Sequence, residues 1–196
     1  MKRIPLIALI SAALFLTGCL ITSVYPFYSG KTSVFEPALL GQWRNVHQPG
    51  ERWMFEQKGE NAYLLTYVSG GKISVLNARS FQLRGHLFLD LFFTDLPADI
   101  QPPPIPSHML LRVFQMDPTL KLAPLDYPWL TRILAENPAA LRHHVIKSGD
   151  RPPDRRIVLT AETAELQQFI IQHLNTSEAW ADSLELKRES LTTTSL

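Results

Sequence analysis

Cysteine is almost absent from this sequence: Cys19 is the only one in 196 residues. A chain with one cysteine can form neither an internal disulfide nor a metal site built from several thiolates. The chain also has no excess of charge of either sign, because 19 basic residues are balanced by 18 acidic ones. Nucleic-acid binding usually needs a basic excess or a basic stripe, so we expect no nucleic-acid partner.

Long apolar runs and catalytic motifs are missing as well. The longest apolar stretch, residues 4–18, contains Pro5 and is shorter than the roughly 20 residues that a membrane-spanning helix needs. The sequence holds no glycine-rich phosphate loop and no HExxH, GxSxG or CxxC motif. It therefore indicates no metal site and no cofactor, and an enzyme is the weakest of the functions considered below.

The informative stretch of the chain is its N-terminus. Lys2 and Arg3 precede the apolar stretch, which residues 16–19 (LTGC) close. A basic start, a short apolar segment and small residues at a cleavage point form the layout of a secretory signal. Cleavage before Cys19 removes two basic residues and no acidic one, leaving a chain of single-domain size with a formal charge of about −1.

The LTGC ending resembles the lipobox of bacterial lipoproteins. The resemblance implies that Cys19 becomes the new N-terminus and carries two or three acyl chains such as palmitate, which is enough for a stable membrane anchor. It also implies a place in the cell envelope, in the outer membrane if the organism has one, because Leu20 and not Asp follows the cysteine.

These signals divide the chain into four parts. We predict a signal peptide at residues 1–18, a lipidated lead segment at 19–36, a single β-rich domain at 37–189 and a disordered tail at 190–196. The lead segment is rich in aromatic residues, which either sit at lipid headgroups or pack on the wall of the domain.

Short alternating segments dominate the domain. In residues 86–94 every second residue from Leu87 onward is apolar, a period typical of a half-buried strand. Ser69–Lys72 (SGGK) is a strong hairpin signal between two such segments. We expect antiparallel strands at residues 41–44, 52–57, 62–68, 73–83, 86–94, 108–116, 120–123, 143–147 and 155–159.

Two helices and one loop interrupt this pattern. Asp126 is predicted to cap a helix that ends near Glu136, and Thr160 to cap a second helix with an apolar stripe. Five prolines between residues 96 and 107 exclude helix and central strand there. Residues 179–188 are predicted to form a final short helix or an edge strand.

The first strand carries Gly41 and Trp43 separated by one residue, after a short helical turn, and this resembles the GxW motif of lipocalins. A helix outside the barrel after the late strands, here near residues 160–174, is a further similarity. The resemblance implies that Trp43 plugs the closed end of a barrel and that Arg188 or Arg156 lies across it. The proline-rich loop and the first helix depart from the family pattern. We predict a mainly β fold with two short-to-medium helices, arranged as an antiparallel lipocalin-like or partly open β-barrel.

Aromatic side chains are the strongest candidates for function. In a closed barrel such rings either fill the interior as core or line an apolar ligand pocket. Alternation identifies the faces of a strand but not the radius of the barrel, so both interpretations stand. The candidate interior residues are Trp53, Phe55, Tyr63, Tyr67, Phe81 and Phe93.

Polar side chains offer little chemistry. His86 and Asp90 share a strand face about 13 Å apart, so each could join a site only with residues from other strands, with His108 as a candidate. Residues 150–156 interleave Asp and Arg and are expected to be solvated, with a phosphate or lipid-headgroup contact as the alternative.

Three functions follow from these features. The first is a membrane-anchored envelope lipoprotein whose barrel binds a small apolar or amphipathic ligand. The alternative is a structural or protein-interaction lipoprotein with a filled barrel, which contacts an envelope protein through residues 96–107 and the helix that carries Trp129. The third, an envelope enzyme, would need several polar side chains that converge in one cleft.

Overall fold

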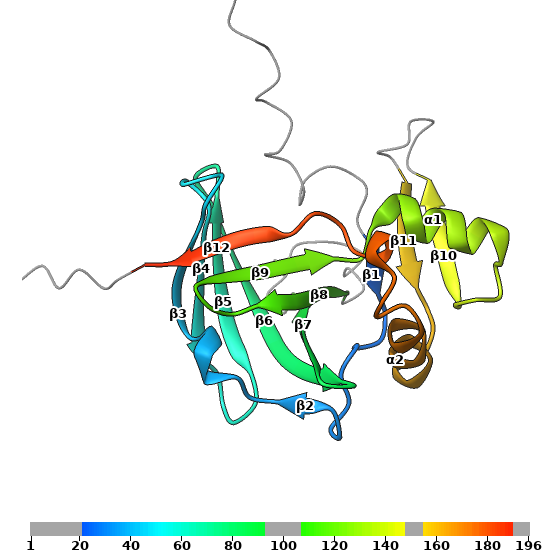
Figure 1. The fold of residues 1–196 in the computed structure, drawn as a ribbon, viewed down its shortest axis with the longest axis horizontal. Helices are drawn as coiled ribbons and strands as arrows, with labels where there is room; N and C mark the ends of the chain where they lie inside the picture. The colour runs from blue at the N-terminus through cyan, green and yellow to red at the C-terminus, as the bar shows by residue number, and fades with distance from the viewer. Residues whose placement is uncertain (1–20, 93–106, 148–154, 190–196) are drawn as a thin grey trace, which may run out of the picture.

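A computed structural model of the chain describes residues 21–92, 107–147 and 155–189. Its main feature is a closed antiparallel β-barrel of eight strands, in which β3 to β9 follow one another around the wall and β12 completes it (Figure 1). The predicted fold class is confirmed. The barrel strands are β3 (Gly41–Asn45), β4 (Arg52–Gln57), β5 (Tyr63–Ser69), β6 (Lys72–Leu83), β7 (His86–Phe92), β8 (His108–Gln115), β9 (Thr119–Pro124) and β12 (Leu184–Arg188).

Closure of the barrel depends on β12, the last strand. It pairs with β3 along one edge and with β9 along the other, and the pairing of β8 with β9 completes the ring. Of the two predictions for residues 179–188, the strand is confirmed, but it is a central strand because both of its edges are paired. The 3-10 turn η3 (Ser177–Ala179) precedes it.

A smaller unit extends the sheet beyond β8 and contains both α-helices (Figure 1). We call it the sheet extension. Its elements are β1 (Ile21–Ser23), β10 (His143–Lys147), β11 (Arg155–Leu159), α1 (Tyr127–Glu136) and α2 (Thr163–Gln172). β1 runs parallel to β11 and antiparallel to β8, where Ser23 pairs with His108. β10 pairs with β11 and ends the sheet.

Residues 21–36, within the predicted lead segment, pack on the folded domain. β1 joins the sheet extension, β2 (Ser33–Val34) pairs with β6, and the 3-10 turn η1 (Pro37–Leu39) leads into β3. The aromatic residues of this segment divide: Phe27 is buried, Tyr28 packs against the same core, and Tyr25 is exposed.

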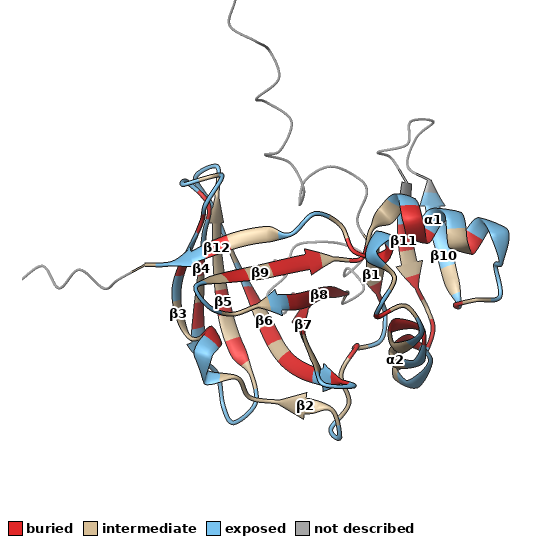
Figure 2. Cartoon of the chain, in the orientation of Figure 1, coloured by how far each residue is buried: buried red, intermediate tan, exposed pale blue. Residues whose placement is uncertain are grey.

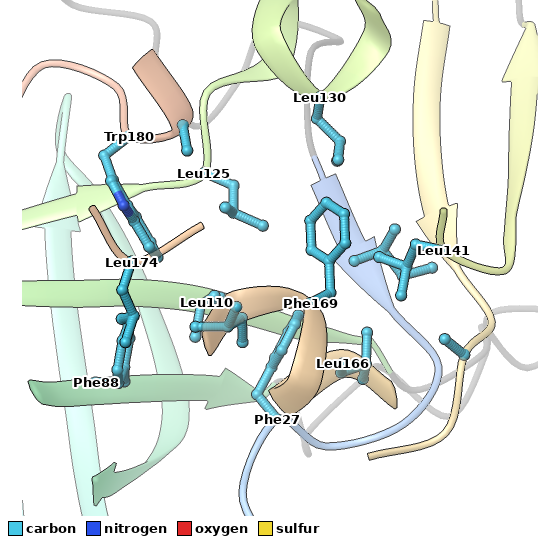
Figure 3. Packing of buried hydrophobic residues seen from close by; sticks show 14 of the residues in the cluster. Phe27, Phe88, Leu110, Leu125, Leu130, Leu141, Leu166, Phe169, Leu174 and Trp180 are labelled. Carbon is cyan, nitrogen blue, oxygen red and sulfur yellow. The ribbon is translucent and has the colours of Figure 1, made fainter. Parts of the chain in front are cut away.

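Two hydrophobic cores result from this arrangement (Figure 2). The inner cluster fills the barrel and draws on every barrel strand, and the outer cluster lies between the barrel wall and the two helices (Figure 3). β7 contributes to both, because Leu89 faces the interior and Phe88 faces the helices. Burying one such side chain stabilises the fold by about 1.5–3 kcal/mol.

The helix boundaries follow local signals with one exception. The Asp126 carboxylate accepts the N–H of Trp129 at 2.7 Å and caps α1 as predicted. α2 begins after Glu162 and not after Thr160, because Glu162 still has extended backbone angles (φ −68°, ψ 159°). The Thr160 N–H donates to the carbonyl of Arg142. Among the described residues, no helix combines the length and apolarity needed to cross a membrane.

Candidate functional site

The barrel interior, where the sequence predicts either a ligand pocket or a filled core, is occupied by aromatic rings. Trp53, Phe55 and Tyr63 are at most 1% exposed. The ring of Phe55 lies 6.2 Å from that of Trp53 and 6.1 Å from that of Tyr63, the latter edge-on. Tyr67 packs edge-on against Trp53 at 5.3 Å. Offset and edge-to-face contacts of this kind are favourable.

In the described part of the barrel, these rings and their aliphatic neighbours pack closely against one another. A side chain next to a void large enough for a water molecule would have some exposed area. Several interior residues have none, so no such void borders them. Of the two best-formed recesses among the described residues, one has no lining residue from the inner cluster, and the other touches that cluster only at Ala78. The interior is therefore a packed core. Its fully covered members are Leu39, Tyr63, Leu65, Leu89, Leu120, Leu122 and Leu186.

A buried carboxylate closes one end of this core. Glu51 accepts hydrogen bonds from Nε1 of Trp53 at 3.0 Å and from Nδ2 of Asn45 at 2.8 Å. Burial raises the pKa of the nearby Tyr67 hydroxyl, and the charge of Glu51 adds to the rise. Both oxygens of Glu51 are engaged by core residues, so they support the packed interior.

Phe81 does not share the barrel interior, and its predicted place there is wrong. Its ring belongs to the outer cluster and stacks on Phe88 at 5.3 Å. The reason is the parity of β6: the even-numbered residues from Leu76 to Ser80 face the interior, and Phe81 faces the helices. Phe93, the sixth candidate, and Cys19 lie outside the described residues.

The opposite end of the barrel carries the predicted GxW arrangement. Nε1 of Trp43 donates to the carbonyl of Leu39 at 2.8 Å. The Arg188 guanidinium lies 4.1 Å from the centroid of the Trp43 ring and donates to two backbone oxygens at the η1 turn. Of the two predicted basic partners, Arg188 takes this position, whereas Arg156 lies on β11.

Gly41 is required beside this contact for a steric reason. Its φ is +112°, and a Cβ added there would lie 2.9 Å from Nη1 of Arg188. A side chain would strain the backbone and displace the guanidinium. Gly41, Trp43 and Arg188 therefore form one unit that ties the last strand of the barrel to the first.

A buried acid–histidine pair lies on the outer wall, beneath the N-terminal segment. Oδ1 of Asp90 is 2.7 Å from Nδ1 of His108, and Oδ2 accepts the N–H of Phe27 at 2.8 Å. Burial raises the pKa of Asp90, and the hydrogen bond and charge of His108 oppose the rise. Asp90 thus finds its partner on the neighbouring strand, as the spacing along β7 requires.

A recess of about 290 Å³ opens beside this pair. Its lining includes Tyr28, Lys58, Asn77, Arg79, Asp90 and Phe92. The Phe92 ring stacks on His108 at 4.6 Å, and the Arg79 guanidinium lies 5.1 Å from the centroid of the Tyr28 ring. Two aromatic side chains and two cations suit an amphipathic anion.

An Asp–His pair can orient a general base, which acts on a side-chain hydroxyl or on a water molecule. Ser23 is the cross-strand neighbour of His108, yet it is fully buried and its Oγ accepts the N–H of Tyr25 at 3.2 Å. The described part of the chain contains no group of three or more metal-ligating side chains. Through Asp90, the pair also holds the backbone of Phe27 against the barrel wall.

A second buried charge, Arg112 on β8, links the barrel to the sheet extension. It donates to the carbonyl of Leu174 at 2.6 Å, and its guanidinium lies 4.4 Å and 5.2 Å from the ring centroids of Phe114 and Trp180. Burial lowers the pKa of Arg112. No sequence pattern marks this residue, because only the tertiary structure covers its outward position on β8.

These observations define the class of protein: a closed, eight-stranded antiparallel β-barrel of lipocalin-like architecture with a packed interior. Compared with known proteins, the chain matches no family model, no curated protein and no solved structure. Its class therefore rests on its own geometry.

Proposed function

We propose that this chain is a lipid-anchored protein of the bacterial cell envelope, in the outer membrane where one exists, whose packed barrel acts as an interaction scaffold. The observation that carries the proposal is the interior, where Trp53, Phe55 and Tyr63 are at most 1% exposed. The LTGC segment that ends at Cys19 supports the anchor. In this proposal the tether holds the barrel beside the bilayer, and the outer surface makes the functional contacts.

The contact surface that the described residues favour surrounds Phe114. This side chain is 49% exposed on β8, and its ring meets that of Trp180 edge-on at 6.3 Å. An exposed aromatic ring held by an arginine and a tryptophan has the composition of a protein-interaction hot spot. Trp129 itself is buried, so a contact through α1, as predicted, would use the exposed residues of that helix. The predicted contact loop, residues 96–107, lies outside the described residues except for its last position.

A second candidate function is the binding of a small amphipathic ligand, which the lipocalin resemblance implies. The recess beside Asp90 favours it, because Tyr28 and Phe92 offer apolar surface and Lys58 and Arg79 offer positive charge. The ligand class would be a lipid-like molecule with a carboxylate or phosphate group. The site lies on the outer wall, not inside the barrel, and its volume of about 290 Å³ lies just below the roughly 300–1,000 Å³ typical of ligand pockets.

Native mass spectrometry of the full chain, purified from membranes in mild detergent, separates the two functions. The scaffold predicts the mass of the acylated chain alone. A bound small molecule that is lost in an Arg79→Gln variant would favour the recess instead. A Phe55→Ala variant supplies a control for the interior, because the cavity it opens should take up a small apolar probe such as benzene. Uptake of the same probe by the unmodified barrel would refute the packed interior.

A further inference from the structure

The start of the sheet extension lies very close to the proposed lipid anchor. β1 begins at Ile21, two residues after Cys19. Two residues of fully extended chain span at most about 7 Å. The headgroup layer on each side of a bilayer is about 5–7 Å thick. A chain acylated at Cys19 therefore cannot hold the start of β1 clear of the headgroups.

Strand register shows which residues share this end of the sheet extension. Ile21 pairs with Ile157 in the parallel β1–β11 ladder, and Ile146 pairs with Arg156 in the antiparallel β10–β11 ladder. The starts of β1 and β11 and the end of β10 consequently lie together, at the end of the extension opposite α2 (Figure 1).

Within residues 21–92, 107–147 and 155–189, neither α-helix covers one face of the sheet extension. The other face is covered by the helices, since Ile157 and Leu159 are buried in the outer cluster. On the first face Ile146 is 43% exposed, beside the exposed Arg156. Arg156 lies directly across the β10–β11 ladder from Ile146, so the two side chains share this face. Apolar and cationic residues side by side fit an anionic lipid surface.

The barrel offers a second point of contact on the same side. In Figure 1 the β3–β4 and β5–β6 hairpins rise on the side of the molecule where β1 and β11 begin. Val46, after β3, is 46% exposed, and Ile73, at the start of β6, is 70% exposed, the largest value among the large apolar residues described. A membrane plane that touches both the hairpins and the end of the sheet extension would meet exposed apolar side chains at each of these two places.

We propose that this side of the molecule, defined by Ile146, Arg156, Val46 and Ile73, is the membrane-contact surface of the protein. Its partner is an anionic phospholipid bilayer: Arg156 meets lipid phosphates, and the three apolar side chains enter the headgroup layer. The proposal rests on the acylation of Cys19 and adds an orientation to it. The recess beside Asp90 and the Phe114 surface then belong to a barrel held in a fixed orientation and not on a free tether.

The test places a fluorophore on single cysteines of the acylated full chain. Acylation blocks Cys19, so Ile146→Cys, Ile73→Cys and a control on α2, Gln168→Cys, each offer one thiol. Gln168 is exposed and lies at the opposite end of the sheet extension. The chains are reconstituted in vesicles of phosphatidylethanolamine and phosphatidylglycerol, and a lipid-bound quencher is added. We expect at least about threefold stronger quenching at positions 146 and 73 than at 168.

The outcomes separate this inference from the anchor itself. Mass spectrometry first establishes whether Cys19 is acylated. If it is, and the three labels are quenched equally, the membrane-contact surface is refuted while the anchor stands. If Cys19 carries no lipid and the chain does not float with vesicles, both proposals fall. An added Arg156→Gln substitution should lower the quenching at 146 by about twofold in the anionic vesicles, and not in vesicles of phosphatidylcholine alone.

Discussion

The Gly41–Arg188 contact supports a prediction whose size can be worked from the structure. In Gly41→Ala, a residue with a side chain must adopt a φ of +112°, and its Cβ would lie 2.9 Å from Nη1 of Arg188. Backbone strain of this kind costs about 1–3 kcal/mol. The displaced guanidinium also loses its contact with Trp43 and hydrogen bonds at a solvent-exposed position, about 1 kcal/mol more. We expect a total loss of about 2–4 kcal/mol in the free energy of unfolding.

A double-mutant cycle separates the two contributions. In an Arg188→Ala background the clash is absent, so Gly41→Ala should cost only the backbone strain, and the two substitutions should couple by at least about 1 kcal/mol. Gly85→Ala is the matched control, because Gly85 also has a positive φ (+79°) but its Cβ would meet nothing within 4 Å. Urea unfolding followed by tryptophan fluorescence measures each term. Additivity of Gly41→Ala and Arg188→Ala within about 0.5 kcal/mol would refute the reasoning.

Three further predictions concern buried groups. Asp90→Asn tests a pH effect: because burial raises the folded-state pKa of Asp90 above 3.8, its contribution to stability is greatest below that value and falls as pH rises through the folded pKa. The stability of the parent relative to the variant should therefore decrease as the pH rises. Urea unfolding between pH 3 and 7, roughly the range over which carboxyl groups titrate, measures it. An increase would contradict the raised pKa of Asp90. Arg112→Ala should lower the free energy of unfolding by about 2–4 kcal/mol, because it leaves the Leu174 carbonyl unpaired. Arg112→Met keeps the apolar stem and should lower it less in the same assay. Equal losses would show that packing by the stem contributes nothing. Phe55→Ala should cost about 3–5 kcal/mol in thermal or urea unfolding, while Ile73→Ala, at an exposed position, should change stability by less than about 0.5 kcal/mol; a small loss for Phe55→Ala would mean that the barrel core is loosely packed.

Local sequence signals were sufficient for many of the elements. β4, β10 and β11 begin and end where the alternation predicts, and Asp126 caps α1. Alternation, turn residues and caps act over a few neighbouring residues, so they can be read without knowledge of the fold. The start of α2 could not be predicted in this way, because the backbone stays extended through Glu162 and Thr160 bonds to Arg142, which is distant in the sequence.

The functional groups depended much more on tertiary structure. Phe81 alternates correctly along β6, but only the packing of the helices decides that its outward face is also buried. The N-terminal segment buries the Asp90–His108 pair, and Arg112 is buried beside Leu174 and Trp180, although each occupies an outward position that normally meets solvent. Alternation shows that two faces of a strand differ, and it does not show what lies against either face.

The sequence by itself determined the class of the fold, the strand series and the Gly41–Trp43 motif, and it predicts the lipid anchor at Cys19. Only the tertiary structure decided that the barrel is closed and filled. Closure requires β12 to pair with β3 and β9, and the filling depends on the combined volume of side chains from all eight strands. Both depend on residues that are far apart in the chain, so no pattern of neighbouring residues predicts them.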